Sequence, residues 1–284
     1  MKLAITPKRL ILGFLQGARK NPAAPVAALT EIGRYFGFTS NHVRVTVTRL
    51  QNLGLLESDG RGRYRLRMEA NPLSRHIDGW RRARPEQSWN GRWLCCTMAP
   101  RLRAADRRPG EKALTFTGFR QAAPGFWVRP DFLPGSREDL HELLAYSGLP
   151  GSSMIFSATD FEGHPEEDWK QSLWPAGEFH TPIRQMLEIL ERSCARLPDL
   201  PRKKALVESF RNGHDCVAII SRDPYLPDEI LSSRPLEQLR GAMLEYDQVA
   251  RRVWEEALAS FPVQIDHPPG GYPAGEADYR RELP

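Results

Sequence analysis

The sequence predicts an α+β fold, because helical and strand patterns follow one another in three blocks along its 284 residues. Short helical patterns and a glycine-rich hairpin occupy residues 1–70. Strand patterns alternate with helical ones over residues 89–165, and apolar residues at helical spacing dominate residues 166–260. We therefore expect an N-terminal domain, a linker helix over residues 71–88, a mixed middle domain and a helical C-terminal domain.

Charge is distributed unevenly between these blocks. Residues 1–85 hold 16 Lys and Arg against 5 Asp and Glu, a net charge of +11, whereas residues 86–284 hold 24 against 30, a net charge of −6. A basic segment of this kind is the electrostatic footprint of a module that binds phosphate groups. The charge distribution thus indicates nucleic acid as the partner of the N-terminal domain.

Three helices are predicted in the N-terminal domain, over residues 10–15, 28–37 and 40–50. The third begins after Thr39, whose hydroxyl can accept a free backbone amide at the helix N-terminus. Helical periodicity places three apolar side chains on its core face: Val43, Val47 and Leu50. The other side carries short polar side chains and one guanidinium: Ser40, Asn41, Arg44 and Thr48. Such groups read base edges and phosphates in a major groove, so this segment is a candidate recognition helix.

A hairpin is predicted next, because two short strand patterns flank a turn that contains Gly60 and Gly62. Its tip and far strand carry four arginines: Arg61, Arg63, Arg65 and Arg67. The order of elements over residues 1–70 predicts a winged helix-turn-helix, in which Arg61 and Arg63 contact phosphate or the minor groove. The alternative is a small helical domain with a hairpin that binds no DNA.

The rest of the chain alternates and then becomes helical. Pro72 opens the predicted linker helix, and composition changes near Pro85. Strands are predicted over residues 93–98, 125–130 and 153–158, a helix is expected to begin within the charged stretch 101–112, and another helix is predicted over 137–144. This alternation predicts a ferredoxin-like middle domain over residues 89–165. Helical spacing over residues 183–197, 203–220 and 235–258 predicts the C-terminal domain, and composition predicts a flexible tail over 261–284.

Composition excludes several classes of protein. No apolar stretch reaches the roughly 20 residues that span a bilayer, and the first apolar run is short for a signal peptide, so we expect a cytoplasmic protein without membrane partners. The four cysteines lack metal-ligand spacing, and we expect neither disulfides nor a metal: Cys95, Cys96, Cys194 and Cys216.

No catalytic set or cofactor motif is recognisable, and we expect no enzyme activity. The enzymatic alternative is a metal-dependent nuclease based on the middle domain, which would need a carboxylate at the end of its first strand. That strand ends Met98-Ala99-Pro100-Arg101, and the first acid is Asp106. The ligands that such chemistry requires are therefore missing.

Four motifs resemble, in this order, those of the PaaX family of transcriptional regulators, named for the repressor of bacterial phenylacetic-acid degradation. They are the segment 39–56 around Val43-Arg44-Val45-Thr46-Val47, then Trp89-Asn90-Gly91-Arg92-Trp93, then residues 123–130, and then Asp223-Pro224-Tyr225-Leu226-Pro227 with the residues up to Leu231. The resemblance spans roughly residues 8–258. It implies a winged helix, a ferredoxin-like middle domain, a helical C-terminal domain, and repression of a catabolic operon that an aryl-CoA thioester relieves.

One departure from the family pattern concerns the C-terminal segment. Family members commonly follow the Leu-Pro motif with Trp-Pro-Gly, whereas residues 232–236 read Ser-Ser-Arg-Pro-Leu here. The sequence therefore does not determine which acyl group the effector carries.

Two sets of residues are candidates for binding a small acidic effector such as an acyl-CoA thioester. Trp127 and Arg129 lie on one face of a predicted strand, where an indole could stack on a ring beside a guanidinium that holds a phosphate; the alternative is a core or interface position. A basic cluster could also meet CoA phosphates, or be a solvated helix face: Arg202, Lys203 and Lys204.

The sequence thus predicts a repressor that acts as a homodimer on palindromic double-stranded operator DNA, because one winged helix reads only a few base pairs. The alternative is a nucleic-acid-processing or adaptor protein that uses the winged helix without an effector.

Overall fold

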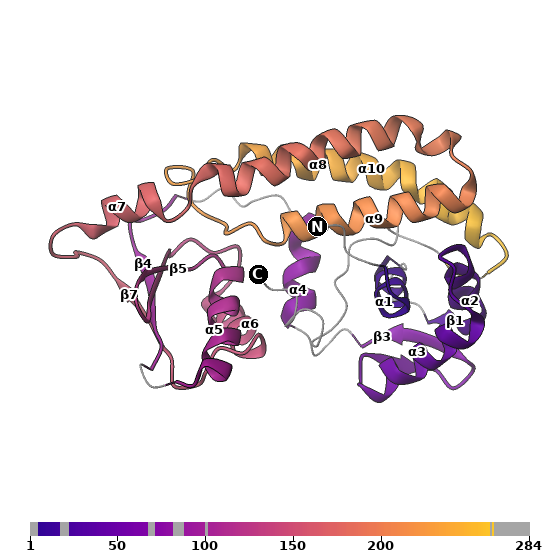
Figure 1. The fold of residues 1–284 in the computed structure, drawn as a ribbon, viewed down its shortest axis with the longest axis horizontal. Coiled ribbons are helices and arrows are strands. Elements are labelled where there is room, and N and C mark those ends of the chain that lie inside the picture. The colour runs from indigo at the N-terminus through magenta and orange to yellow at the C-terminus, as the bar shows by residue number, and fades with distance from the viewer. Residues whose placement is uncertain are drawn as a thin grey trace. The chain divides into compact units, whose positions relative to one another are not determined.

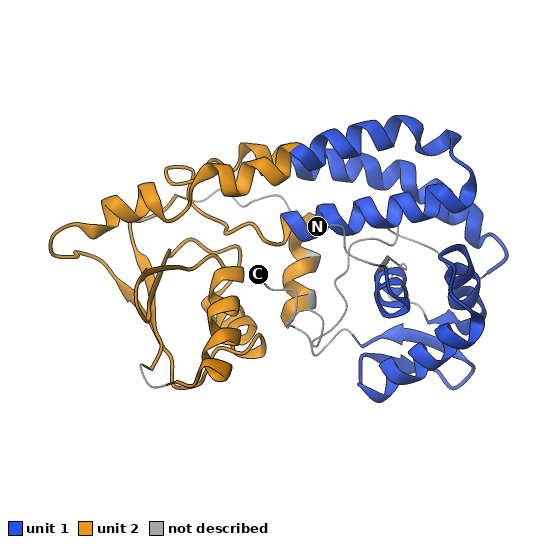
Figure 2. Ribbon diagram, viewed as in Figure 1, with its two compact units in different colours: residues 1–71, 185–219, 239–279 blue, residues 72–184, 220–238, 280–284 orange. Residues whose placement is uncertain are grey.

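The computed structural model describes residues 5–17, 23–67, 72–81, 88–99, 102–261 and 263. It consists of helices and two small antiparallel sheets, one of three and one of four strands, which confirms the predicted α+β class. The chain divides into two compact units (Figure 2). Unit 1 comprises residues 1–71, 185–219 and 239–279, and unit 2 comprises residues 72–184, 220–238 and 280–284.

Unit 1 contains the predicted N-terminal helices and hairpin. The helices are α1 (Pro7–Gly17), α2 (Val26–Tyr35) and α3 (Ser40–Asn52), and the strands are β1 (Ala24–Pro25), β2 (Leu56–Ser58) and β3 (Arg63–Leu66). β3 pairs with β1 on one side and with β2 on the other, so the sheet order is β1-β3-β2. The expected helices over residues 10–15, 28–37 and 40–50 are confirmed, as is the hairpin.

The C-terminal part of the chain forms three long helices: α8 (Ala176–Arg196), α9 (Arg202–Ile220) and α10 (Arg234–Leu258) (Figure 1). The short 3-10 helix η3 (Leu197–Asp199) lies between α8 and α9. The predicted helical segments are confirmed, but residues 166–260 do not form a compact unit of their own, because these helices contribute residues to both units.

The reason lies in the core of unit 1, where apolar side chains of α9 and α10 complete the core of the N-terminal helices. The side chains that they contribute are Leu206, Phe210, Trp254 and Leu258. The Trp254 ring stacks 6.3 Å from that of Phe36, and the Phe210 ring meets Phe36 edge-on at 5.4 Å. The N-terminal helices therefore bury part of their apolar surface against the C-terminal ones.

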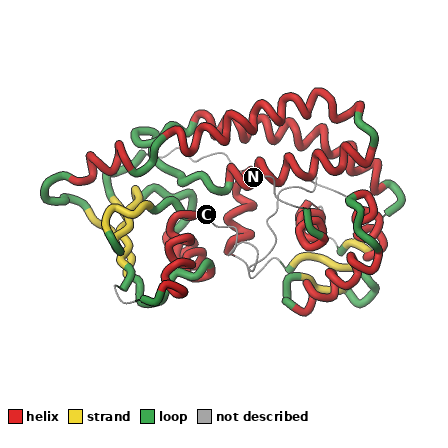
Figure 3. Tube along the Cα trace, in the orientation of Figure 1, coloured by secondary structure: helices red, strands yellow, loops and turns green. Residues whose placement is uncertain are grey.

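Unit 2 is built around a four-stranded antiparallel sheet (Figure 3). Its elements run β-α-β-β-α-β: β4 (Trp93–Thr97), α5 (Ala104–Phe116), β5 (Arg120–Ala123), β6 (Phe126–Pro130), α6 (Arg137–Tyr146) and β7 (Met154–Ala158). The strand order is β5-β6-β4-β7. The sequence did not predict β5, because Arg120-Gln121-Ala122-Ala123 lacks β-branched and aromatic residues.

Both faces of this sheet are covered. Helix-facing side chains such as Leu94 and Cys96 of β4 pack with Leu114 of α5 and Leu144 of α6. The other face forms a second core, with Trp93 against Trp174, Leu226 and Leu231. Unit 2 also contains α4 (Pro72–Asp78) with the 3-10 helix η2 (Gly79–Arg81), and α7 (Pro165–Ser172).

Two sequence predictions fall partly on residues that the structure does not describe. Of the predicted flexible tail over residues 261–284, only Phe261 and Val263 are described. Of the predicted linker over residues 71–88, the described part is residues 72–81 and residue 88. Among the described helices, none has a run of apolar residues long enough to cross a bilayer.

Candidate nucleic-acid interface

Helix α3 begins and packs as its sequence predicts. The Thr39 side-chain oxygen accepts a hydrogen bond from the backbone N–H of His42 at 3.2 Å, which caps the helix. Val43, Val47 and Leu50 are buried in the core of unit 1. One face of α3 is therefore anchored, and the opposite face is left to solvent.

The turn before α3 depends on two glycines. Gly37 has φ +83°, a conformation that residues with a side chain rarely adopt, and it ends α2. Gly33 lies where α2 meets α3, and a Cβ atom added to it would lie 2.5 Å from Cγ2 of Val43. The two helices approach each other this closely because residue 33 has no side chain.

The outward face of α3 carries polar side chains, several of which have no partner within the chain. Four of the predicted base-reading residues are exposed: Ser40, Asn41, Arg44 and Thr48. Among the described residues, the side chains of Asn41 and Arg44 make no hydrogen bond or ion pair. The Thr48 hydroxyl donates to the carbonyl of Arg44 at 3.2 Å, so its oxygen and its methyl group are what it can offer a ligand.

The same face includes three residues that the sequence analysis did not single out: Val45, Arg49 and Asn52. All three are exposed. The helical period that selected Asn41, Arg44 and Thr48 also selects Val45 and Asn52, which follow Asn41 by four and eleven residues. Val45 is apolar and Asn52 lies beyond the predicted helix end at residue 50, so the sequence pattern did not single them out.

The hairpin tip presents Arg61 to solvent. Gly60 and Gly62 on either side of it have φ +81° and +70°. The Asp59 carboxylate accepts the backbone N–H of Arg61 at 3.1 Å, and the Ser58 hydroxyl accepts that of Gly60 at 3.1 Å. The side chain of Arg61 is exposed and makes no contact of this kind within the described residues.

Arg63, predicted beside Arg61 as a DNA contact, makes hydrogen bonds within unit 1. Its Nε and Nη2 donate to the backbone carbonyl of Ala23 at 3.0 and 2.7 Å, and its Nε lies 3.6 Å from a carboxylate oxygen of Asp59. These bonds fasten the segment before β1 to β3. The sequence did not indicate this structural role, because the partner lies 40 residues away along the chain.

The prediction that Arg129 holds an effector phosphate does not fit its surroundings. The guanidinium is 2% exposed, and it donates to five backbone carbonyls. Four of these bonds have ordinary lengths, to Pro130 (3.2 Å), Phe132 (2.8 Å), Pro224 (3.2 Å) and Tyr225 (3.3 Å), and the fifth goes to Thr117. Burial lowers the pKa of Arg129 to about 10, so it stays charged at neutral pH. Its donors join loops of unit 2 and are not available to a ligand.

Trp127 is likewise an interior residue. Its side chain is 6% exposed and lies in the helix-facing core of unit 2 with Leu114, Leu140 and Leu144. The alternative interpretation of this strand, an aromatic residue in the core, therefore describes its position, and the predicted stacking surface is not formed.

The third effector candidate is accessible. Arg202, Lys203 and Lys204 occupy the first turn of α9 in unit 1, and all three are exposed. Among the described residues, none of their side chains makes an ion pair. They are free to meet phosphate groups, and equally free to be a solvated helix face.

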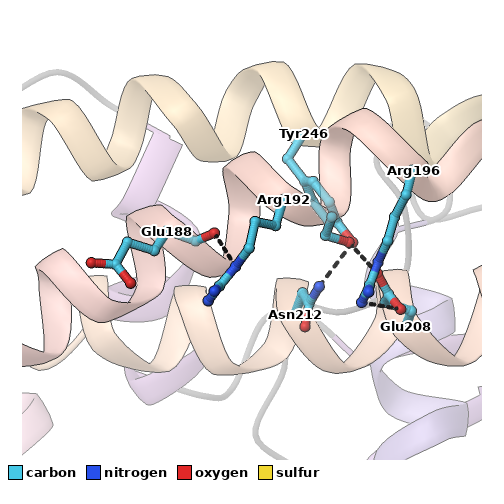
Figure 4. Close-up of polar contacts among 7 residues, drawn as sticks. Glu188, Arg192, Arg196, Glu208, Asn212 and Tyr246 are labelled. Atoms are coloured by element: carbon cyan, nitrogen blue, oxygen red, sulfur yellow. Dashed lines mark hydrogen bonds and ion pairs between the residues drawn. The ribbon is translucent and has the colours of Figure 1, made fainter.

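A partly buried polar network joins α8, α9 and α10 in unit 1 (Figure 4). The Tyr246 hydroxyl lies 2.9 Å from that of Ser193 and accepts from the Asn212 amide at 3.2 Å. Ser193 also donates to Glu208 at 2.6 Å, and Arg196 donates to both carboxylate oxygens of Glu208 at 3.0 and 2.8 Å. The hydrogen-bonding groups of these side chains are paired with one another, and the bonds link the three helices.

Nothing in the described residues assembles a metal or thiolate site. No three His, Cys, Asp or Glu side chains of the described part come together in a geometry that could hold a metal ion. Burial raises the pKa of Cys95 and of Cys96 to about 11, so both stay protonated at neutral pH. Pro100 and Arg101, which weighed against a nuclease in the sequence analysis, lie outside the described residues.

The described part of unit 2 also contains a cavity of about 210 Å³ beside the first turns of α6. It is lined by three apolar residues, Leu94, Leu140 and Ile155, and by three polar ones, Arg137, Glu138 and His141.

Comparison with known proteins gives a fold and no function. No family model matches the chain, and no curated protein matches it. A solved structure of the uncharacterized protein Rv0674 from Mycobacterium tuberculosis is similar, with a TM-score of 0.63 and 22% sequence identity. The match covers 90% of this chain and 99% of that one, so the fold is shared over nearly its whole length.

Proposed function

We propose that this protein is a sequence-specific DNA-binding transcriptional regulator, and that it represses a catabolic operon until a small acidic effector releases it. The observation that carries the proposal is the outward face of α3. It is capped by Thr39, anchored by Val43 and Val47, and it exposes Asn41 and Arg44 without intramolecular partners. Polar side chains on a rigidly held helix are what direct readout of a major groove requires.

Three further features support a winged helix-turn-helix. The helix pair α2–α3 is followed by the β2–β3 hairpin, as in DNA-binding domains of that class. The hairpin tip presents Arg61, which suits a phosphate or the minor groove. The net charge of +11 over residues 1–85 supplies the attraction to DNA.

The finer assignments are part of the same proposal. The β-α-β-β-α-β order of unit 2 and its strand order support a ferredoxin-like domain. The four motifs support membership of the PaaX family, and with it a cytoplasmic repressor whose effector is an aryl-CoA thioester. With Trp127 and Arg129 in the interior, the remaining phosphate-binding candidates are Arg202, Lys203 and Lys204.

The DNA-binding proposal is tested on DNA selected from random duplexes by the full-length protein. Arg44→Ala should weaken binding to the selected site by about 1 to 3 kcal/mol and relax discrimination between site variants. Arg252→Ala removes the same charge from an exposed position on α10 and serves as the matched control. Equal affinities of the folded Arg44→Ala protein and the wild type, measured by fluorescence anisotropy, would exclude α3 as the reader.

The effector proposal needs a separate measurement, because effector and operator must oppose each other by the same coupling free energy, typically about 1 to 3 kcal/mol. A protein with Arg202, Lys203 and Lys204 replaced by alanine should bind operator and no longer release it when phenylacetyl-CoA is added. Calorimetry in which the wild type binds no acyl-CoA thioester would favour a free aromatic acid, or the alternative of an adaptor protein without an effector.

We also propose a homodimer, since two half-sites are needed for specific affinity in the usual range. In unit 2, β7 is an edge strand without proline or charge, and it exposes Met154 and Phe156 by 66% and 43%. If dimers form through this strand, Phe156→Lys should raise the monomer fraction in sedimentation and shorten the DNA footprint to one half-site. A monomeric wild type at micromolar concentration with a non-palindromic footprint would refute the dimer.

A further inference from the structure

Val45 is an apolar residue in the middle of the polar outward face of α3. Its side chain is 58% exposed, whereas the neighbouring valines at 43 and 47 are each 1% exposed. It follows Asn41 by one helical turn and precedes Thr48 by three residues, so these three side chains lie together on the surface.

The fold of unit 1 does not account for Val45. The core contacts of α3 are made by Val43, Val47 and Leu50, and a β-branched residue is a weaker helix former than alanine at an exposed position. A single exposed apolar side chain is ordinary on a protein surface, so exposure by itself carries no weight. The position of Val45 is what matters. Val45 lies next to Asn41 and Arg44, whose side chains have no partner among the described residues.

The major groove offers an apolar surface of a specific kind. Among the four bases, only thymine presents a methyl group in the major groove, on its C5 atom. Apolar side chains recognise this methyl group by contact. On the same edge, adenine presents the donor and acceptor that an asparagine side chain pairs with.

We infer that Val45 is a specificity-determining residue that contacts the C5-methyl group of a thymine, next to an adenine read by Asn41. The inference rests on the proposed function. It adds the chemistry of the target, since each half-site then contains A·T pairs at the positions that face the N-terminal half of α3.

The test uses the full-length protein and the selected DNA site, in which each thymine of a half-site is replaced in turn by deoxyuridine. This substitution removes one methyl group and leaves every hydrogen-bonding group in place. At one position, wild-type affinity should fall about fourfold, the ratio expected for losing the burial of one methyl-sized group. Val45→Ala should weaken binding to the unmodified site by a similar factor and respond no further to deoxyuridine at that position.

Leu53→Ala provides the matched control. Leu53 is also apolar and 60% exposed, but it caps the C-terminal end of α3. The Leu53→Ala protein should keep the wild-type response to deoxyuridine, and circular dichroism should show that both variants are folded.

Two results would overturn the inference. One is the same deoxyuridine response in Val45→Ala as in the wild type, and the other is no response of the wild type at any thymine. Either result can occur while Arg44→Ala still loses affinity, in which case DNA reading by α3 stands and only the role of Val45 fails. Absence of any specific DNA binding would instead refute the proposed function itself.

Discussion

Individual arginines of this protein have three different surroundings, and their substitution should have three different effects. Arg44 and Arg61 point to solvent without partners among the described residues, Arg63 holds the carbonyl of Ala23, and Arg129 lies buried among five carbonyls. An arginine of this protein is therefore a solvent-exposed candidate for DNA contact, a link within the hairpin region or a buried link between loops, according to which acceptors lie within its reach.

Substitutions of Arg61 and of Arg63 should affect different properties, DNA binding in the first case and stability in the second. Arg61→Ala should leave stability unchanged and reduce the slope of log affinity against log salt by about one, because one phosphate contact is lost. Arg63→Ala should lower the free energy of unfolding by about 1 to 2 kcal/mol, because the Ala23 carbonyl loses its donors. Urea denaturation and anisotropy at several salt concentrations measure the two effects. A stable Arg63→Ala protein with a reduced salt slope would instead show that Arg63 contacts DNA and contributes little to the fold.

Tyr246 gives a prediction that depends on pH. Burial raises the pKa of Tyr246 to about 12 from its ordinary value of 10, so the folded state retains a proton that the unfolded state releases between those values. Stability should therefore fall as the pH rises from about 10 towards 12. In Tyr246→Phe this part of the decline should disappear, and stability at pH 8 should drop by about 1 kcal/mol because Ser193 and Asn212 lose a partner.

Tyr35→Phe is the control for this measurement. Tyr35 packs against the core of the N-terminal helices, and its hydroxyl makes no hydrogen bond within the described residues. Tyr35→Phe should change the stability at pH 8 little. An unchanged alkaline decline in Tyr246→Phe would assign it to other groups, such as Cys95 and Cys96, whose pKa values burial also raises.

Among the elements, the contact of α2 with α3 sets the geometry of the candidate reading surface. Gly33→Ala would place a Cβ 2.5 Å from Cγ2 of Val43, which is buried and cannot turn away easily. We expect a loss of about 1 to 3 kcal/mol in stability from this overpacking, with partial recovery in the double variant Gly33→Ala/Val43→Ala. Thermal denaturation measures both.

Gly241→Ala in α10 is the matched control, because a Cβ there would meet nothing within 4 Å. It should be neutral or stabilise the protein by up to about 1 kcal/mol, since alanine is the better helix former. If Gly33→Ala and Gly241→Ala had equal effects on stability, the close approach of α2 to α3 would not be the reason that residue 33 must be glycine.

For the whole molecule, the core of the N-terminal helices is completed by the C-terminal helices. Residues 1–84 alone would expose the core surface that Phe210 of α9 and Trp254 of α10 cover. We expect this truncated protein to bind a hydrophobic dye and to unfold without a cooperative transition, whereas the full chain unfolds cooperatively. A sharp melting transition of residues 1–84 would show that the N-terminal elements fold independently.

Much of the candidate interface could be predicted from the sequence, since its signals are local. The Thr39 cap, the spacing of Val43, Val47 and Leu50, and the glycines of the hairpin act within a few residues of where they stand. Local backbone preference and the 3.6-residue period are enough to determine such elements and the side chains that they expose.

Only the tertiary structure decided what those elements pack against and which polar groups are already occupied. Helical periodicity says that a face of α9 is buried, but not that Phe210 meets the N-terminal helices. In the same way, the acceptors of Arg63 and Arg129 lie up to 40 and 96 residues away along the chain. Contacts over such separations depend on the tertiary packing of the whole chain, and no short stretch of sequence contains that information.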